Sequence, residues 1–167
     1  MGEKRTILLE RLTRSPQETE ALGTALGRLL DGGRGLALVG DLGAGKTLFA
    51  RGVAKGLGVE DAQEVSSPSY LLMLEYPGPV PFYHFDGYFA EKERTFLEEG
   101  GRVLLEGEGV ALVEWADRLE PWIPPHFLWI HLRIPRGEPR HRRLVFSGDP
   151  SLWGPLLKKL EKREERK

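Results

Sequence analysis

The chain has 167 residues, a net charge of −1 and an apolar share of 40%. This length favours one domain, residues 1–167, and a chain of this size buries about two thirds of its extended surface. The chain has no cysteine, so disulfides and thiolate metal sites are excluded. This suits a cytoplasmic protein. We expect no membrane segment, because no apolar run approaches the length of a span.

Charge is unevenly distributed along the chain. From Arg133 to the end, Lys and Arg outnumber Asp and Glu by 11 to 5. Such a basic end is typical of contact with nucleic acid or with an acidic partner. A helix face exposed to solvent explains it equally well, so the composition leaves both interpretations open.

The first elements have clear boundaries. Residues 6–12 predict a strand. Ser15, Pro16 and Glu18 then predict a helix start, with Ser15 as N-cap, Pro16 first in the helix and Glu18 closing a capping box. The helix carries an apolar stripe of four leucines: Leu22, Leu26, Leu29 and Leu30.

Residues 36–47 combine a strand with a phosphate-binding motif. Residues 36–39 are apolar, as in a buried strand, and residues 40–47 fit the P-loop (Walker A) pattern Gly-x4-Gly-Lys-Thr. Phe49, Val53 and Leu57 follow at helical spacing. Strand, glycine-rich turn and helix therefore occur in the order that the motif requires, although a plain turn would use similar residues.

The residue types of this loop suit a nucleotide. Glycine allows backbone angles that other residues avoid, so the loop can direct its N–H groups at phosphate. Lys46 adds a positive charge and Thr47 a hydroxyl for Mg²⁺. The expected nucleotide-binding residues are Gly40, Asp41, Leu42, Gly43, Ala44, Gly45, Lys46, Thr47 and Leu48.

Two carboxylates stand at predicted strand ends. Residues 71–76 and 80–85 predict a hairpin whose second strand ends in Asp86, and the apolar run 110–113 ends in Glu114. Nucleotide-binding α/β proteins use an acidic residue at such a strand end to hold Mg²⁺ or its water. Glu114 is the first candidate and Asp86 the second; a carboxylate that faces only water is the alternative for each.

The last third predicts two strands and a helix. Residues 127–132 and 142–146 read as strands, and Ser151 is expected to cap a helix with an apolar face. Residues 158–167 are almost wholly charged, and we expect them to fray into solvent.

Four motifs in this order resemble the TsaE (formerly YjeE) family of bacterial ATPases. They are residues 40–47, Ser-Pro-Ser-Tyr at 67–70, Tyr-His-Phe-Asp-Gly-Tyr at 83–88 and Val-Glu-Trp at 113–115. The resemblance covers the chain from Ser15 to about Arg143. It implies an α/β, small P-loop NTPase fold with a mostly parallel central sheet, antiparallel additions and helices on both faces.

The resemblance also implies cofactors and roles. It implies ATP and Mg²⁺, with Thr47 and Glu114 binding the metal. It implies catalytic functions for four residues, namely Lys46, Ser69 (in a switch near the γ-phosphate), Asp86 and Glu114. A late arginine, Arg140 or Arg142, is expected near the base. The sequence departs from the family pattern at Ser69, where threonine is usual, and at Phe89, where arginine is usual.

Members of this family act in the threonylcarbamoyl modification of adenosine 37 in tRNAs that read codons beginning with A. The resemblance implies partners similar to TsaB and TsaD, of which TsaD performs the transfer, and contact with tRNA only through that complex. It also implies weak ATPase activity in isolation. The sequence shows no evident arginine finger, which favours an element supplied by a partner.

Two other function classes compete. A P-loop kinase for a small metabolite usually needs a lid with arginines, and the span 89–109 is short and acidic. A GTPase commonly selects guanine with an Asn-Lys-x-Asp motif, and this chain has no Asn. The ATPase subunit is therefore the leading hypothesis, the kinase the second and the GTPase the third.

Overall fold

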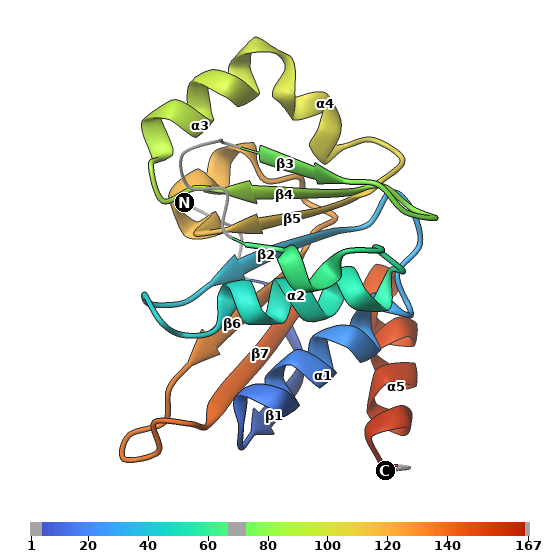
Figure 1. Cartoon of the computed structure of the whole chain (residues 1–167), viewed down its shortest axis with the longest axis vertical. Coiled ribbons are helices and arrows are strands. Elements are labelled where there is room, and N and C mark those ends of the chain that lie inside the picture. Colours follow the sequence, from blue (N-terminus) through green and yellow to red (C-terminus); the bar gives the residue numbers. More distant parts are fainter. Residues whose placement is uncertain (1–4, 67–72, 166–167) are drawn as a thin grey trace.

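The computed structural model describes residues 5–66 and 73–165, with side chains up to residue 163. Its strands form one sheet in the order β1-β7-β6-β2-β5-β4-β3 (Figure 1). Their bounds are β1 (Thr6–Thr13), β2 (Gly35–Val39), β3 (Met73–Tyr76), β4 (Phe82–Asp86), β5 (Val110–Glu114), β6 (Leu128–Arg133) and β7 (Arg142–Gly148). The inner strands β6, β2, β5 and β4 are parallel, and the edge pairs are antiparallel. This confirms the predicted fold class and the β3–β4 hairpin.

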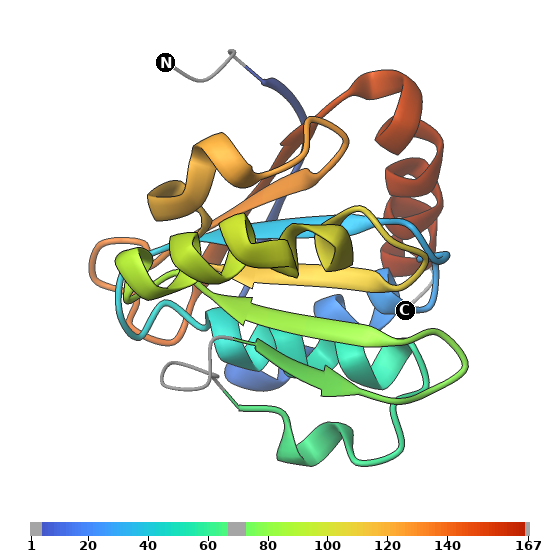
Figure 2. The same cartoon turned by 90° about the horizontal axis from the view of Figure 1, so that it is seen from above.

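Helices cover both faces of the sheet (Figures 1 and 2). One face packs against α1 (Pro16–Gly27), α2 (Lys46–Gly56) and α5 (Pro150–Glu165). The other packs against α3 (Ala90–Phe96), α4 (Arg102–Leu105) and the 3₁₀ helix η3 (Ala116–Trp122). Two further turns, η1 (Ala62–Glu64) and the π-helical η2 (Leu97–Gly101), complete the elements. Both faces of the inner strands are buried, which explains their continuous apolar runs.

Glycines let α1 and α2 approach closely. A Cβ added at Gly23 would lie 2.5 Å from Phe49 O, and a Cβ added at Gly52 would lie 2.2 Å from Glu20 O. Gly27 and Gly56 make the same kind of backbone contact one turn further along each helix. The position of α2, which begins with Lys46, is therefore set by backbone contact with α1.

The helix ends confirm one prediction and correct two. Ser15 Oγ accepts from Glu18 N at 3.1 Å, as expected of the N-cap. At α5, however, the cap is Asp149, whose Oδ1 accepts from both N and Oγ of Ser151. The expectation that residues 158–167 fray was wrong as far as residue 165, because α5 continues and Leu160 is fully buried. No helix in the described ranges is long and apolar enough to cross a membrane.

Candidate functional site

The loop of residues 40–45 joins β2 to α2, as predicted. Gly43 and Gly45 have φ angles of +82° and +100°, which other residues rarely adopt. Gly45 precedes α2, and no side chain caps the N-terminus of that helix. The first-turn N–H groups therefore have no side-chain acceptor and can bind an anion.

Lys46 lies folded over this loop. Its Nζ donates to Gly40 O at 2.5 Å and to Asp41 O at 2.9 Å. The same nitrogen lies 4.0 Å from the ring centroid of Trp115. Burial lowers the pKa of Lys46, and neighbouring carboxylates, Glu114 foremost, oppose that shift. Lys46 is thus a buried cation whose hydrogen bonds go to loop carbonyls.

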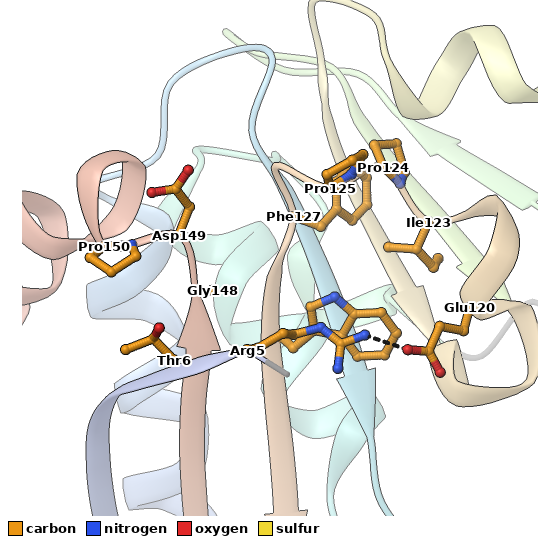
Figure 3. A pocket seen from close by; sticks show the side chains of 11 residues that line it. Arg5, Thr6, Glu120, Ile123, Pro124, Pro125, Phe127, Gly148, Asp149 and Pro150 are labelled. Carbon is orange, nitrogen blue, oxygen red and sulfur yellow. Dashed lines mark hydrogen bonds and ion pairs between the residues drawn. The ribbon is translucent and has the colours of Figure 1, made fainter. Parts of the chain in front are cut away.

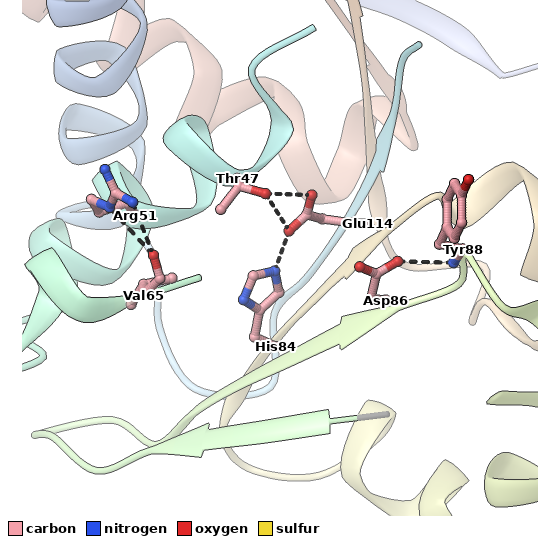
Figure 4. A network of polar contacts seen from close by, with 7 residues as sticks. All are labelled: Thr47, Arg51, Val65, His84, Asp86, Tyr88 and Glu114. Atoms are coloured by element: carbon pink, nitrogen blue, oxygen red, sulfur yellow. Dashed lines mark hydrogen bonds and ion pairs between the residues drawn. The ribbon is translucent and has the colours of Figure 1, made fainter. Parts of the chain in front are cut away.

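Glu114 connects the loop to the neighbouring strand β4 (Figure 4). Thr47 Oγ1 donates to its two carboxylate oxygens at 3.0 and 3.2 Å. His84 Nε2 lies 2.5 Å from Glu114 Oε2, and both side chains are almost fully buried. Since a carboxylate only accepts, we assign the donated proton to His84 Nε2. His84 Nδ1 is buried without a partner in the described structure.

Thr47 and Glu114 fit a magnesium ion. Mg²⁺ binds oxygen at about 2.0–2.1 Å in octahedral geometry, so neighbouring ligands lie about 3 Å apart. The Thr47 and Glu114 oxygens are 3.0 Å apart. No group of three or more His, Cys, Asp or Glu in the described part of the chain could hold a metal by itself. Further ligands would therefore be phosphate and water oxygens, as is usual for Mg²⁺.

Asp86 lies beside Glu114, since the two are paired residues of β4 and β5. Its Oδ1 accepts from Tyr88 N at 2.8 Å, in the turn that leaves β4 (Figure 4). Glu93 on α3 is fully buried, and neither of its oxygens has a partner in the described residues. Burial, and secondly the charge of Asp86, raise the pKa of Glu93 to about 8.

A cavity of about 420 Å³ opens between the loop and an aromatic wall. The loop side contains Lys46 and Thr47; Tyr88, Phe89, Glu114 and Trp115 form the opposite side. Trp115 has a φ of +54° and is the one non-glycine residue with positive φ in the described ranges. A second cavity, of about 430 Å³, lies at the other edge of the sheet, where Arg5 pairs with Glu120 (Figure 3). It contains none of the predicted site residues.

The remaining predicted residues are placed differently. Arg142 lies against the loop, donating from Nε to Ala44 O at 2.8 Å and from Nη2 to Gly43 O at 3.2 Å. Arg140 is exposed in the turn before β7. Asp41 and Leu48 flank the loop, one at its beginning and one in the first turn of α2. Ser69 and the predicted switch at 67–69 lie outside the described residues.

No role was predicted for three side chains at this site: His84, Trp115 and Tyr88. For His84 a signal was present, because it precedes Asp86 by two residues in a strand and therefore shares its face. For Trp115 and Tyr88 the motifs gave the positions without indicating that the two rings line one cavity.

Comparison with known proteins gives a consistent family. A family model described as "Threonylcarbamoyl adenosine biosynthesis protein TsaE" matches residues 13–144. A relative from Treponema pallidum, named tRNA threonylcarbamoyladenosine biosynthesis protein TsaE, is 37% identical over 123 residues, which cover 74% of this chain and 90% of the relative. A Bacillus subtilis relative of the same name is 35% identical over 153 residues, which cover 91% of this chain and 93% of the relative.

Structural comparison agrees. The crystal structure of Bacillus subtilis YdiB superposes with a TM-score of 0.73 at 28% identity and covers 98% of this chain and 99% of that one. The family match contains the loop, the end of β4 with Asp86 and the end of β5 with Glu114. By sequence and by fold, the chain belongs to the TsaE family of threonylcarbamoyladenosine biosynthesis proteins.

Proposed function

We propose that this chain binds ATP with Mg²⁺ in the 420 Å³ cavity and hydrolyses it weakly when alone. In the cell it would act in the cytoplasm, with TsaB- and TsaD-like partners, in the threonylcarbamoyl modification of adenosine 37 of tRNA. The observation that carries the proposal is the contact of Thr47 with Glu114 directly beside the loop. It joins the two expected metal ligands at the point where a helix N-terminus and Lys46 offer positive charge.

Each site residue has a part in this proposal. The loop N–H groups and Lys46 bind the phosphates, and Lys46 exchanges the carbonyls of Gly40 and Asp41 for phosphate oxygens. Thr47 and Glu114 hold Mg²⁺, which when bound neutralises charge on the phosphates. His84 keeps Glu114 oriented through its hydrogen bond.

Further residues act at the two ends of the nucleotide. Asp86, beside Glu114, orients the attacking water, and Ser69 belongs to the switch near the γ-phosphate. Arg142 is the better candidate for the adenine side, because it lies against the loop at Gly43 and Ala44. Arg140 remains the second candidate.

Calorimetric titration with ATP, with and without Mg²⁺, tests the site. We expect Lys46→Ala to weaken ATP binding at least tenfold, since loss of a charge-assisted hydrogen bond costs about 1.5–3 kcal/mol. Glu114→Gln should retain much of the binding while losing Mg²⁺-dependent hydrolysis. Lys55→Ala, an exposed lysine on the same helix, is the control and should bind normally. Unchanged affinity in Lys46→Ala would contradict the loop assignment.

Reconstitution with TsaB- and TsaD-like partners tests the biological role. Modified adenosine on tRNA should require this chain, and the Glu114→Gln chain should not replace it. A specific phosphorylated metabolite, found when acceptors are screened with labelled ATP, would instead indicate a kinase.

A further inference from the structure

Arg118 stands at the outer edge of the aromatic wall of the cavity. Its guanidinium carbon lies 4.7 Å from the ring centroid of Trp115 and 5.0 Å from that of Tyr88. Its Nη1 donates to Tyr88 O at 2.6 Å. Both rings line the cavity beside the loop, so this arginine stacks on residues that face the expected phosphate position.

The backbone of Arg118 is held in η3, while its side chain binds one carbonyl and stacks on two rings. Arg118 N donates to Trp115 O at 3.0 Å, which fixes the start of η3. The side chain is exposed, and no carboxylate of the described residues pairs with it. A two-pronged, charge-assisted bond to phosphate is stronger than ring stacking at an exposed site together with one bond to the Tyr88 carbonyl, so a bound phosphate can draw the guanidinium inward.

The cavity beside the loop has little positive charge of its own. Lys46 is the one positively charged residue among those that line it in the described structure. Lys46 and Arg118 lie 4.0 and 4.7 Å from the centroid of the same Trp115 ring. Two cations therefore contact one indole, and the charge of each attracts a phosphate that binds beside the loop.

Other arginines near the loop are engaged elsewhere. Arg142 binds the loop carbonyls from outside, and Arg51 donates to Val65 O. Arg94 stacks on Trp122 and donates to the carbonyl of Arg118. Arg118 is therefore the arginine that the fold places at the aromatic wall.

We propose that Arg118 is a catalytic residue of this chain that contacts the terminal phosphate during hydrolysis. As water adds to the γ-phosphorus, the bond to the bridging oxygen breaks, its electrons leave with ADP, and the water's proton passes to the phosphate that forms. Negative charge grows on the bridging oxygen in the transition state, where a guanidinium stabilises it together with the charge of the phosphoryl oxygens. This rests on the proposed ATPase function. It supplies within the chain the charge that the sequence led us to expect from a partner.

The test measures hydrolysis and binding by Arg118→Gln, which retains the stem and a donor but loses the charge. We expect kcat to fall by about 10²–10³, both for the chain alone and with TsaB- and TsaD-like partners. Affinity for MgADP should be unchanged, whereas affinity for MgADP with aluminium fluoride should fall together with kcat. Arg118→Lys should give an intermediate kcat, because it keeps the charge without the planar fork.

Arg102→Gln is the control, since Arg102 is exposed on α4 and pairs with Glu106 away from the cavity. An unchanged kcat in Arg118→Gln overturns the proposal. An equal loss of MgADP affinity and kcat in Arg118→Gln also overturns it. So does a lowered melting temperature that accounts for the lost activity of both Arg118→Gln and Arg118→Lys. Failure of the unmutated chain to bind ATP would overturn the proposed function itself, which separates the two outcomes.

Discussion

At the scale of single residues, the site concentrates buried polar groups around one carboxylate. Glu114 accepts from Thr47 on α2 and contacts His84 on β4, so three elements meet at one side chain. Buried charges are tolerated in proteins when they are paired in this way. Glu93 differs, since it is fully buried and its oxygens have no partner in the described residues.

Glu93 makes stability depend on pH. Its pKa is about 8 in the folded chain and 4.5 in the reference state. Below the lower value both states are protonated; as pH rises, the unfolded state ionises first and stability is lost until about pH 8. Glu93→Gln cannot ionise, so its stability relative to the unmutated chain should rise by about 3–4 kcal/mol between pH 5 and pH 8.

Urea unfolding at the two pH values measures this difference. Glu91→Gln, at an exposed position of the same helix, should show no such change. If the curves for Glu93→Gln and the unmutated chain stay parallel from pH 5 to pH 8, the buried carboxyl is ionised in the folded state.

Single residues also show where prediction from sequence ended. Glu114 could be predicted because an apolar strand followed by a carboxylate is a local pattern. His84 is 30 residues from Glu114. Their contact depends on β4 lying next to β5, which no periodicity reveals. The same holds for Glu93, whose burial depends on how α3 packs and which looked like one more charge in an acidic span.

At the scale of elements, the strand, loop and helix of residues 35–56 could be predicted because their signals are local. The extent of α5 could not, because Leu160 is buried by tertiary packing and its neighbours are charged. The cap of α5 was misassigned because Asp149 and Ser151 both have capping side chains. Helix packing was also not predicted, although glycines recur at four-residue spacing in both α1 and α2.

The glycine contact between α1 and α2 predicts a stability effect. At Gly52, a methyl group would lie 2.2 Å from Glu20 O, a backbone atom that cannot turn aside. Gly52→Ala should therefore destabilise the fold by about 1–3 kcal/mol, even though alanine favours helix by about 1 kcal/mol. It should also weaken ATP binding, because α2 carries Lys46 and Thr47.

Gly154→Ala is the matched control for this prediction. Gly154 lies in α5, and an added Cβ there meets nothing within 4 Å. Alanine at that position should stabilise by about 0.5–1 kcal/mol, measured as the urea midpoint. If both variants gain stability, α1 and α2 do not pack through their glycines.

At the scale of the whole molecule, one sheet joins the first strand to the last. β1 pairs with β7, so the N-terminal segment and the strand before α5 are neighbours (Figure 1). The strand β2, which leads into the loop of residues 40–45, lies between β6 and β5, near the middle of that sheet. We propose that such an arrangement unfolds as one domain, and that a ligand bound at the loop stabilises all of it.

Thermal unfolding by calorimetry tests both statements together. A single transition is expected for the chain alone. A ligand at 100 times its dissociation constant adds about 2.7 kcal/mol, which corresponds to a rise of about 5–10 °C for a chain of this size. MgATP should produce that rise in the unmutated chain and in Lys55→Ala, and Lys46→Ala should lose about half of it or more at the same concentration. Two separate transitions would contradict the single domain, and an equal rise in all three chains would mean that the nucleotide binds away from the loop.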